Sequence, residues 1–449
     1  MTPFLSRQLI YPLQESLLNR PTFPYLESLE KTQWLSRFEL EALQLQKLQA
    51  LLKSAQLHSP WHAERIASSG MNLDALSFEE LRKLPTMNKV DAQNNGQAMA
   101  WHEVPGGSFS YTTGGSSGAP LIFRYGRNRQ ASDAAGRIRA RRWWQVNVGD
   151  REVYLWGAPV ELNNTDKIKT LRDRLINQLV LNAFAMSPTT MESYLKMIQR
   201  FNPSCIYGYA SSVALLAEYA KRNQRNLHLP ALKVVCTTGE PLYPEQRQLI
   251  TEVFKVPVAN EYGSRDIGFT AHENSHQQML LMSESILLEV LDDSGQPVKA
   301  GEIGEAVMTG LCSEAQSFIR YRTGDMVRLA ADLDKEGRGL HVIDEVLGRE
   351  TDFLIHQDGS IIHALAAIYV LRETPGIEQF KITQQTLYDF EILVVCNEHW
   401  KSEGLGIISD KFKARFGSAC NTHIQLVKEI LPEASGKMRQ VVSKVAIPI

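Results

Sequence analysis

The sequence predicts an α/β protein with a large N-terminal domain and a smaller C-terminal α+β domain. Three observations lead to this prediction. The chain has 449 residues, more than one hydrophobic core usually supports, so two or three domains are expected. Before Ile286, short apolar runs alternate with stretches of helical periodicity, as in an α/β sheet. After Ile286, apolar strand patterns joined by turns predominate.

The first element predicted along the chain is helical. Between Glu30 and Leu57 apolar residues recur at helical spacing, which predicts one long amphipathic helix or a pair of helices. After a glycine-rich loop, the run LIFRY is typical of a strand. It leads into a basic helix that is expected from about Asn128 to Trp144.

Helices and buried strands alternate in the middle of the chain. Ser187 and Pro188 have the residue types of a helix cap and a first helical position. The short apolar run LKVVCTTG predicts a buried strand that ends at Gly239. Pro244 opens the next helix, which precedes a strand in VPVANEYG. Strand and helix in alternation predict an α/β sheet.

The last part of the chain has a different pattern. An Asp-Ser-Gly turn joins two strands in ILLEVLDDSGQPVKAGEIGEAVMTGL, which predicts an antiparallel hairpin. A smaller unit is predicted to begin near Gly348. It contains strands in FKITQQ and YDFEILVVC, a helix near Ser409 to Phe416 and a strand in HIQLVKEI. The predicted domains are therefore residues 1–347 and 348–449.

The composition favours a small-molecule substrate. The 48 Lys and Arg residues nearly balance the 50 Asp and Glu residues, without the basic patch that nucleic acid requires. No stretch has the roughly 18 apolar residues of a membrane span, and the N-terminus lacks a secretory pattern, so we expect a cytoplasmic protein. Five cysteines without CxxC spacing are typical of reduced, buried thiols.

A loop rich in glycine and hydroxyl groups follows Tyr111. Its residues are Thr112, Thr113, Gly114, Gly115, Ser116, Ser117 and Gly118. Glycines let backbone N–H groups converge on an anion and the hydroxyls add donors, so the loop could hold phosphate. A flexible turn is the alternative. The loop also fits G-x-S-x-G with Ser116 as the nucleophile of a serine hydrolase, but a strand-like run follows instead of the helix that this motif needs.

Five further blocks follow this loop in order: TTGEPL, NEYGSRD, RYRTGD, LGRETD and SGKMR. Together the six blocks resemble those of the adenylate-forming superfamily, which includes the acyl-CoA ligases. The resemblance is closest to the phenylacetate-CoA ligase branch and the capsule-biosynthesis proteins grouped with it, and it extends from about His58 to the end of the chain. It implies the adenylate-forming enzyme fold, with a mobile C-terminal domain.

The resemblance also implies an activity. MgATP would activate a carboxylic acid as an acyl-adenylate, and the acyl group would pass to a thiol, with CoA as the favoured acceptor. An amine, a hydroxyl or a carrier-protein thiol stays open as the acceptor, and so does a homodimer. A nucleotide- or acyl-binding protein without turnover is a further alternative, because Leu121 stands where the family has a loop lysine.

The roles in nucleotide binding are carried over from the resemblance. Tyr262 would stack on adenine, and Asp266 would hold Mg²⁺ where the family has glutamate. Asp325 would accept from both ribose hydroxyls and Arg349 would add a donor. The remaining residues expected around the nucleotide are Gly239, Glu240, Pro241, Glu261, Gly263 and Ser264.

The C-terminal roles follow in the same way. Lys437 matches the lysine that reaches from the small domain to the α-phosphate during adenylation. The hinge between the domains would lie at Thr351 and Asp352.

The acid pocket is predicted from positions that resemble those of this branch. They are Trp143, Tyr207, Gly208, Tyr209 and Ala210. An aromatic wall favours a flat aryl acid, similar to phenylacetate, because stacked rings add roughly 0.5 to 1.5 kcal/mol to burial. Packing in the core is the alternative for the tryptophan.

A metal site is weighed at three other residues. His272 and His276 have a spacing that could place them on one helical face, and Cys312 is the one cysteine near them in the sequence. The second cysteine of a closed zinc site is missing, so polar surface histidines are the default expectation.

Overall fold

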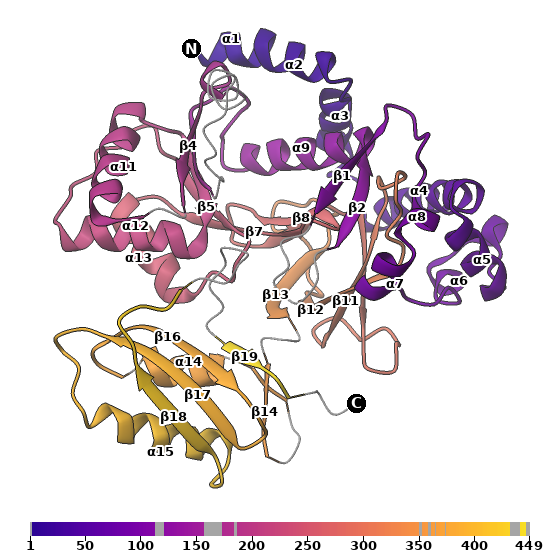
Figure 1. Ribbon diagram of the computed structural model, residues 1–449. Coiled ribbons are helices and arrows are strands. Elements are labelled where there is room, and N and C mark those ends of the chain that lie inside the picture. The colour runs from indigo at the N-terminus through magenta and orange to yellow at the C-terminus, as the bar shows by residue number, and fades with distance from the viewer. Residues whose placement is uncertain are drawn as a thin grey trace.

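The computed structural model describes residues 2–112, 121–156, 173–183, 186–349, 353–357, 361–363, 365–372, 374–431 and 441–445. Within these residues a large α/β body carries one long mixed sheet, and a smaller C-terminal unit has a sheet of its own (Figure 1). None of the described helices is both long and apolar enough to cross a membrane.

The N-terminal part of the chain is helical. The long periodic stretch forms a pair of helices, which separate because Ser36 caps the second helix in a reciprocal pair of bonds with Glu39. The helices are α1 (Pro3–Leu5), α2 (Tyr11–Leu17), α3 (Thr22–Thr32), α4 (Arg37–His58), α5 (Pro60–Ser69), α6 (Phe78–Leu81), α7 (Lys89–Asn94) and α8 (Gly96–Met99), with a π-helix at Ser6–Ile10 and a 3₁₀ turn at Leu73–Ala75.

The long sheet joins a parallel half to an antiparallel half. Its strand order is β10-β11-β12-β13-β9-β8-β7-β6-β5-β3-β4. Strands from β3 to β7 pair in parallel, and pairing is antiparallel from β7–β8 onward. The strands are β3 (Glu152–Trp156), β4 (Gln178–Asn182), β5 (Cys205–Tyr209), β6 (Val234–Thr238), β7 (Val258–Ser264), β8 (Gly268–Glu273), β9 (Met279–Leu281), β10 (Ile286–Leu291), β11 (Ile303–Gly310), β12 (Tyr321–Leu329) and β13 (Val342–Arg349).

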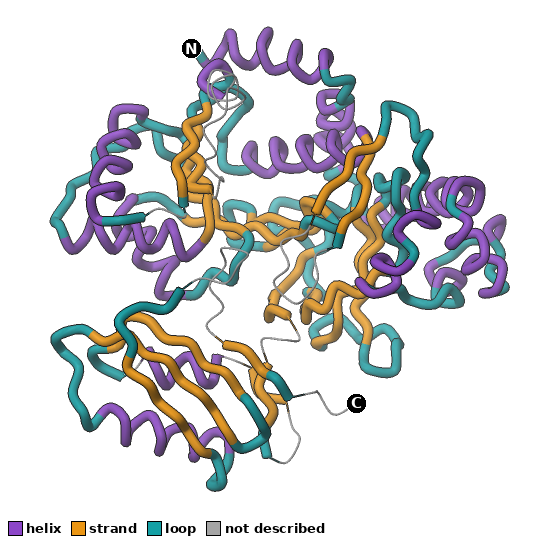
Figure 2. Tube along the Cα trace, in the orientation of Figure 1, coloured by secondary structure: helices purple, strands orange, loops and turns teal. Residues whose placement is uncertain are grey.

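Helices cover both faces of the parallel half (Figures 1 and 2). On one face α11 (Pro188–Phe201), α12 (Ala210–Arg222) and α13 (Pro244–Phe254) pack over alternate strand residues such as Ile206 and Val235. The other face carries α9 (Arg127–Arg142) and the tryptophans after it. The predicted starts hold: Ser187 caps α11 by accepting from the backbone N–H of Thr190, and Pro244 opens α13.

Before α9, strands β1 (Ser108–Thr112) and β2 (Ile122–Gly126) form an antiparallel hairpin around the glycine-rich loop. The C-terminal unit has the strand order β18-β17-β16-β19 around a core of Phe390, Phe412 and Phe416. Its elements are β14 (Phe353–Ile355), β15 (Ile361–His363), α14 (Leu365–Arg372), β16 (Ile377–Gln384), β17 (Asp389–Cys396), α15 (Gly404–Phe416), β18 (Asn421–Leu426) and β19 (Val441–Ser443). Helix α15 begins five residues before the predicted start at Ser409, because Ile408 and Phe412 share its buried face.

Candidate active site

Three residues predicted to hold the nucleoside come together where β7 lies near β12. The Tyr262 hydroxyl donates a hydrogen bond to Oδ2 of Asp325 at 2.7 Å. Asp325 is buried in β12, and the strand register sets its backbone opposite Arg349 in β13. The structure therefore brings together residues from three of the sequence blocks.

Asp266 lies in the turn between β7 and β8, close to this group. Its Oδ2 accepts from the hydroxyl of Tyr321, the first residue of β12, at 2.8 Å. Arg129 of α9 donates to the backbone oxygens of Arg265 and Asp266, both at 2.6 Å. Arg265 in turn donates to the backbone oxygen of Thr112, at 3.0 Å. The turn is thus fixed from α9 and linked to the start of the glycine-rich loop.

Several predicted residues lie outside the described part of the chain. They are Thr113 to Gly118 of the loop, Thr351 and Asp352 of the hinge, and Lys437. Thr112 is described and ends β1. The element described after the loop is strand β2, whereas a nucleophile elbow needs a helix there, so the fold disfavours the serine hydrolase.

The strip predicted to lie against adenine follows β6. Gly239 has a φ of +76°, and a Cβ there would lie 3.1 Å from the ring of Tyr209, so the backbone approaches the ring closely. Glu240 accepts from the backbone N–H of Ser211 at 3.0 Å, in the first turn of α12. Pro241 continues the loop between β6 and α13.

At the end of β7 the backbone of Gly263 lies close to the backbone of Gly268. A Cβ at Gly263 would lie 2.7 Å from the backbone oxygen of Gly268, at a β-bulge between β7 and β8. Ser264 accepts from the backbone N–H of Ile267 at 3.2 Å. These contacts shape the turn that carries Asp266.

Glu261 lies at the centre of a buried polar cluster. Its Oε1 accepts from the hydroxyl of Tyr207 at 2.8 Å and from that of Thr238 at 3.1 Å. Arg137 and Arg141 of α9 approach its Oε2 at 3.8 and 4.0 Å. Burial, followed by the charge of Glu261, raises the pKa of Tyr207, so the phenol stays protonated and donates.

Sequence reasoning missed Arg137, Arg141 and Thr238. The signal was present in the basic helix, because residues four apart lie on one helical face and Arg137 and Arg141 have that spacing. Without the sheet opposite, nothing distinguished these arginines from the other cations of the helix.

An aromatic stack lies beside this cluster. The indole of Trp156, at the end of β3, stacks on Tyr209 with a centroid distance of 4.5 Å and on Tyr207 with 5.7 Å. A Cβ at Gly208 would lie 2.6 Å from the backbone oxygen of Leu155, which allows the two strands to approach. Ala210 is buried at the start of α12. Trp156 is a further aromatic residue that the sequence reasoning missed.

Trp143 has a different environment. Its indole N–H donates to Oε1 of Gln33 at 3.2 Å, and the guanidinium groups of Arg139 and Arg338 lie within 6 Å of its ring. Trp144 donates to the backbone oxygen of Glu273 at 2.9 Å. The structure does not bring Trp143 into the stack of Trp156 with Tyr207 and Tyr209.

The spacing of His272 and His276 would suit one helical face, but β8 and a turn occupy this segment. His272 is fully buried, and its Nε2 accepts from Arg141 at 2.8 Å, so the expectation of a surface histidine is wrong here. His276 contacts Glu336 at 3.7 Å, whereas Cys312 is buried elsewhere. In the described ranges, no three His, Cys, Asp or Glu residues form a metal-ligating group.

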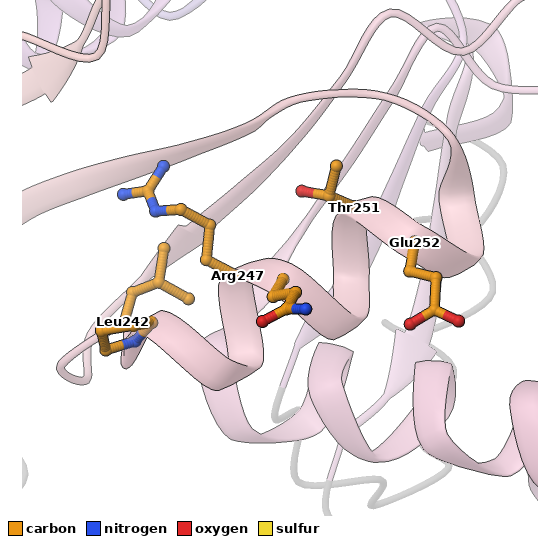
Figure 3. Close-up of a pocket in the computed structure, with 6 residues that line it drawn as sticks. Leu242, Arg247, Thr251 and Glu252 are labelled. Carbon is orange, nitrogen blue, oxygen red and sulfur yellow. The ribbon is translucent and has the colours of Figure 1, made fainter.

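A surface pocket of about 650 Å³ runs along α13 (Figure 3). Leu242, Pro244, Arg247, Gln248, Thr251 and Glu252 line it. None of these residues belongs to the predicted site, and Arg247 is bound to the backbone oxygen of Val258 and to Glu273. The candidate active site is therefore assigned from the convergence of the sequence blocks and not from this pocket.

Comparisons with known proteins show what this chain is similar to. The model of the CapK C-terminal domain matches residues 354–444. Protein CapK of Staphylococcus aureus is 22% identical over 91% of this chain and 90% of its own length. A phenylacetate-coenzyme A ligase of Pseudomonas putida is 24% identical over 85% of this chain and 89% of its own.

Among solved structures, 2-hydroxyisobutyryl-CoA ligase in the postadenylation state superposes with a TM-score of 0.69 at 20% identity. The match covers 92% of this chain and 91% of that chain. The comparisons confirm the resemblance to phenylacetate-CoA ligases and CapK-type proteins. The fold is that of the adenylate-forming ligases, with a large α/β part and a smaller C-terminal part.

Proposed function

We propose that this chain is an acid–thiol ligase, which activates a carboxylic acid with ATP as an acyl-adenylate and transfers the acyl group to CoA. The observation that carries the proposal is the hydrogen bond from Tyr262 to Asp325, with Arg349 in register beside Asp325. Three blocks that are far apart in the sequence meet there. The relatives named phenylacetate-coenzyme A ligase support the same reaction.

In the first step, a carboxylate oxygen of the acid attacks the α-phosphorus of ATP, and the bond to the departing pyrophosphate breaks. Asp325 holds the ribose by accepting from its hydroxyls, and the ring of Tyr262 covers the adenine. In the second step, the sulfur of CoA attacks the acyl carbon, and AMP leaves. Neither step needs a covalent bond to the enzyme.

Asp266 is the residue that would hold Mg²⁺. Its donor chemistry fits, because a carboxylate is a hard oxygen ligand and only its Oδ2 accepts a hydrogen bond from a described residue. The link from Arg265 to Thr112 keeps this turn beside the base of the loop that would hold the phosphates. Bound Mg²⁺ would neutralise charge on the phosphates.

The other predicted roles belong to the same proposal. The loop residues Thr113 to Gly118 hold the β- and γ-phosphates, Lys437 neutralises charge at the α-phosphate, and Thr351 with Asp352 forms the hinge. The domain boundary is placed at residues 347 and 348. We also propose a cytoplasmic location, and a homodimer stays open.

An ATP–pyrophosphate exchange screen over aryl and aliphatic acids tests this function without assuming the acceptor. We expect exchange with at least one acid, and we expect Asp325→Asn to raise the KM for ATP about 10- to 100-fold, since a hydrogen bond to a charged group contributes ~1.5 to 3 kcal/mol. Asp74→Asn, at a carboxylate whose side chain is 89% exposed, is the matched control. Absence of exchange with every acid, in folded protein, would refute the activity.

A further inference from the structure

The polar cluster at Glu261 lies where α/β folds commonly bind ligands. Tyr207, Thr238 and Glu261 lie on the neighbouring parallel strands β5, β6 and β7, and Thr238 is the last residue of β6. The register pairs Tyr209 with Thr238 and Thr238 with Glu261, so the three strands lie side by side. Ligands of open α/β sheets bind outside the carboxyl ends of such strands.

Glu261 has one oxygen that is satisfied and one that is not. Oε1 accepts from two hydroxyls, whereas Oε2 is buried and accepts no hydrogen bond from the described residues. The approaches of Arg137 and Arg141, at 3.8 and 4.0 Å, are too long for hydrogen bonds. Only 5% of the Glu261 side chain is exposed, so bulk water does not compensate for the missing donor.

Arg137, beside the same oxygen, has a hydrogen-bond donor that lacks an acceptor among the described residues. Its Nε is buried without an acceptor, although 38% of the side chain is exposed. Its guanidinium lies over the ring of Phe269, 5.1 Å from the ring centre. The guanidinium thus has donors available next to an acceptor that lacks one. A hydroxyl is the simplest group that can donate to Glu261 and accept from Arg137 at once.

The charge balance favours a neutral group. Two guanidinium groups, those of Arg137 and Arg141, face two carboxylates, those of Glu152 and Glu261. An additional ionised group would leave one charge unpaired in a buried site. An uncharged hydroxyl leaves the balance unchanged.

We infer that the acid activated by this chain carries a neutral hydroxyl, which donates to Oε2 of Glu261 and accepts from Arg137. The inference rests on the proposed function and names its substrate class. The stacked rings of Trp156 and Tyr209 beside the cluster make a hydroxylated aryl acid the first compound to test. A plain aryl acid would leave Oε2 of Glu261 without its donor.

The test is pyrophosphate exchange with pairs of acids that differ by one hydroxyl. Phenylacetate and its three ring-hydroxylated isomers form the aryl set, and aliphatic acids with their hydroxy derivatives form the second. We expect at least one hydroxylated acid to be preferred about 10- to 100-fold in kcat/KM over its parent. Glu261→Gln keeps an acceptor for Tyr207 and Thr238 but places an amide beside Arg137, so this preference should fall to within about threefold.

Glu284→Gln is the matched control, since Glu284 is also a buried carboxylate that binds an arginine of α9, Arg139. We expect it to keep the preference, and thermal denaturation checks that both variants fold. If Glu261→Gln does not fold, Arg137→Met serves as the second variant with the same expected loss.

Equal kcat/KM values for both members of every pair, unchanged in Glu261→Gln, would overturn the inference. The cluster would then bind water instead of the acid, and the proposed ligase activity would be unaffected. Absence of exchange with all acids would instead refute the proposed function, and the inference with it.

Discussion

At the scale of single residues, two histidines are held neutral by the fold. The ring of His62 is fully buried, and its Nε2 donates to the backbone oxygen of Ser317 at 2.8 Å. Burial, with a smaller contribution from Arg65, lowers the pKa of His62 to about 3. Burial and the charge of Arg37 lower the pKa of His341 to about 3 as well. In the unfolded chain both would titrate near their ordinary value of 6.5.

This difference predicts a loss of stability in mild acid. Between pH 6.5 and pH 3 the unfolded chain binds a proton at each histidine and the folded chain does not. The contribution is therefore complete above pH 6.5 and decreases as the pH falls, by about 1.4 kcal/mol per pH unit for each histidine. Thermal denaturation at pH 7.0 and 5.0 should show a smaller decrease of Tm for His62→Gln than for the native chain. An identical decrease would contradict the assignment.

Single glycines also decide the shape of the site. At Gly263 any larger residue would place its Cβ against the backbone oxygen of Gly268. At Gly239 the positive φ and the ring of Tyr209 exclude a side chain for two separate reasons. Backbone geometry alone therefore explains why glycine stands at these two positions of the sequence blocks, without any contact with a ligand.

At the scale of elements, helix α9 connects the turn of Asp266 with the polar cluster at Glu261. Its Arg129 holds the turn of Asp266 through two backbone oxygens, while Arg137, two turns later, approaches Glu261. These two arginines of α9 thus interact with backbone oxygens of the turn after β7 and with a carboxylate of β7.

Loss of Arg129 should therefore weaken the binding of Mg²⁺ without removing any residue that would bind the metal directly. For Arg129→Gln we expect the Mg²⁺ concentration that gives half-maximal pyrophosphate exchange to rise about tenfold, since the backbone of Asp266 is no longer fixed. The KM for the acid should change by less than about threefold. A magnesium titration of exchange measures the first quantity and an acid titration the second.

Arg127→Gln, on the same helix, is the control. Arg127 donates to Gln130 and, among the described residues, has no hydrogen bond to the turn of Asp266. An unchanged magnesium requirement in Arg129→Gln would show that the turn keeps its position without this contact.

At the scale of the whole molecule, the C-terminal unit has its own sheet and core. Lys437→Ala should lower the rate of acyl-adenylate formation about 100-fold, because a fixed charge at the α-phosphate is lost. Transfer to CoA from supplied acyl-adenylate should fall by less than about threefold. Single-turnover assays of each half-reaction separate the two effects.

Lys428→Ala, at an exposed lysine of the same unit, controls for the loss of a positive charge. Equal losses in both half-reactions of Lys437→Ala would argue against alternation of the two domains.

The sequence predicted elements wherever the cause is local. A cap at Ser187, a proline at residue 244 and the apolar run before Gly239 each act within a few residues, and the structure has the expected elements there. The structure of the segment from His272 to His276 was not predicted, because its cause is not local. Its spacing fits a helical face, but pairing with β7 and β9 makes β8 a strand and buries His272.

The sequence by itself determined the alternation of strands and helices and the order of the six blocks, since these depend on residue types and short spacings. Only the tertiary structure decided that Tyr262 contacts Asp325 and that Glu261 lies between Tyr207, Thr238 and Arg137. The partners in these contacts are separated by 23 to 124 residues along the chain. Strand order and register set such contacts, and both depend on the packing of the whole sheet against α9.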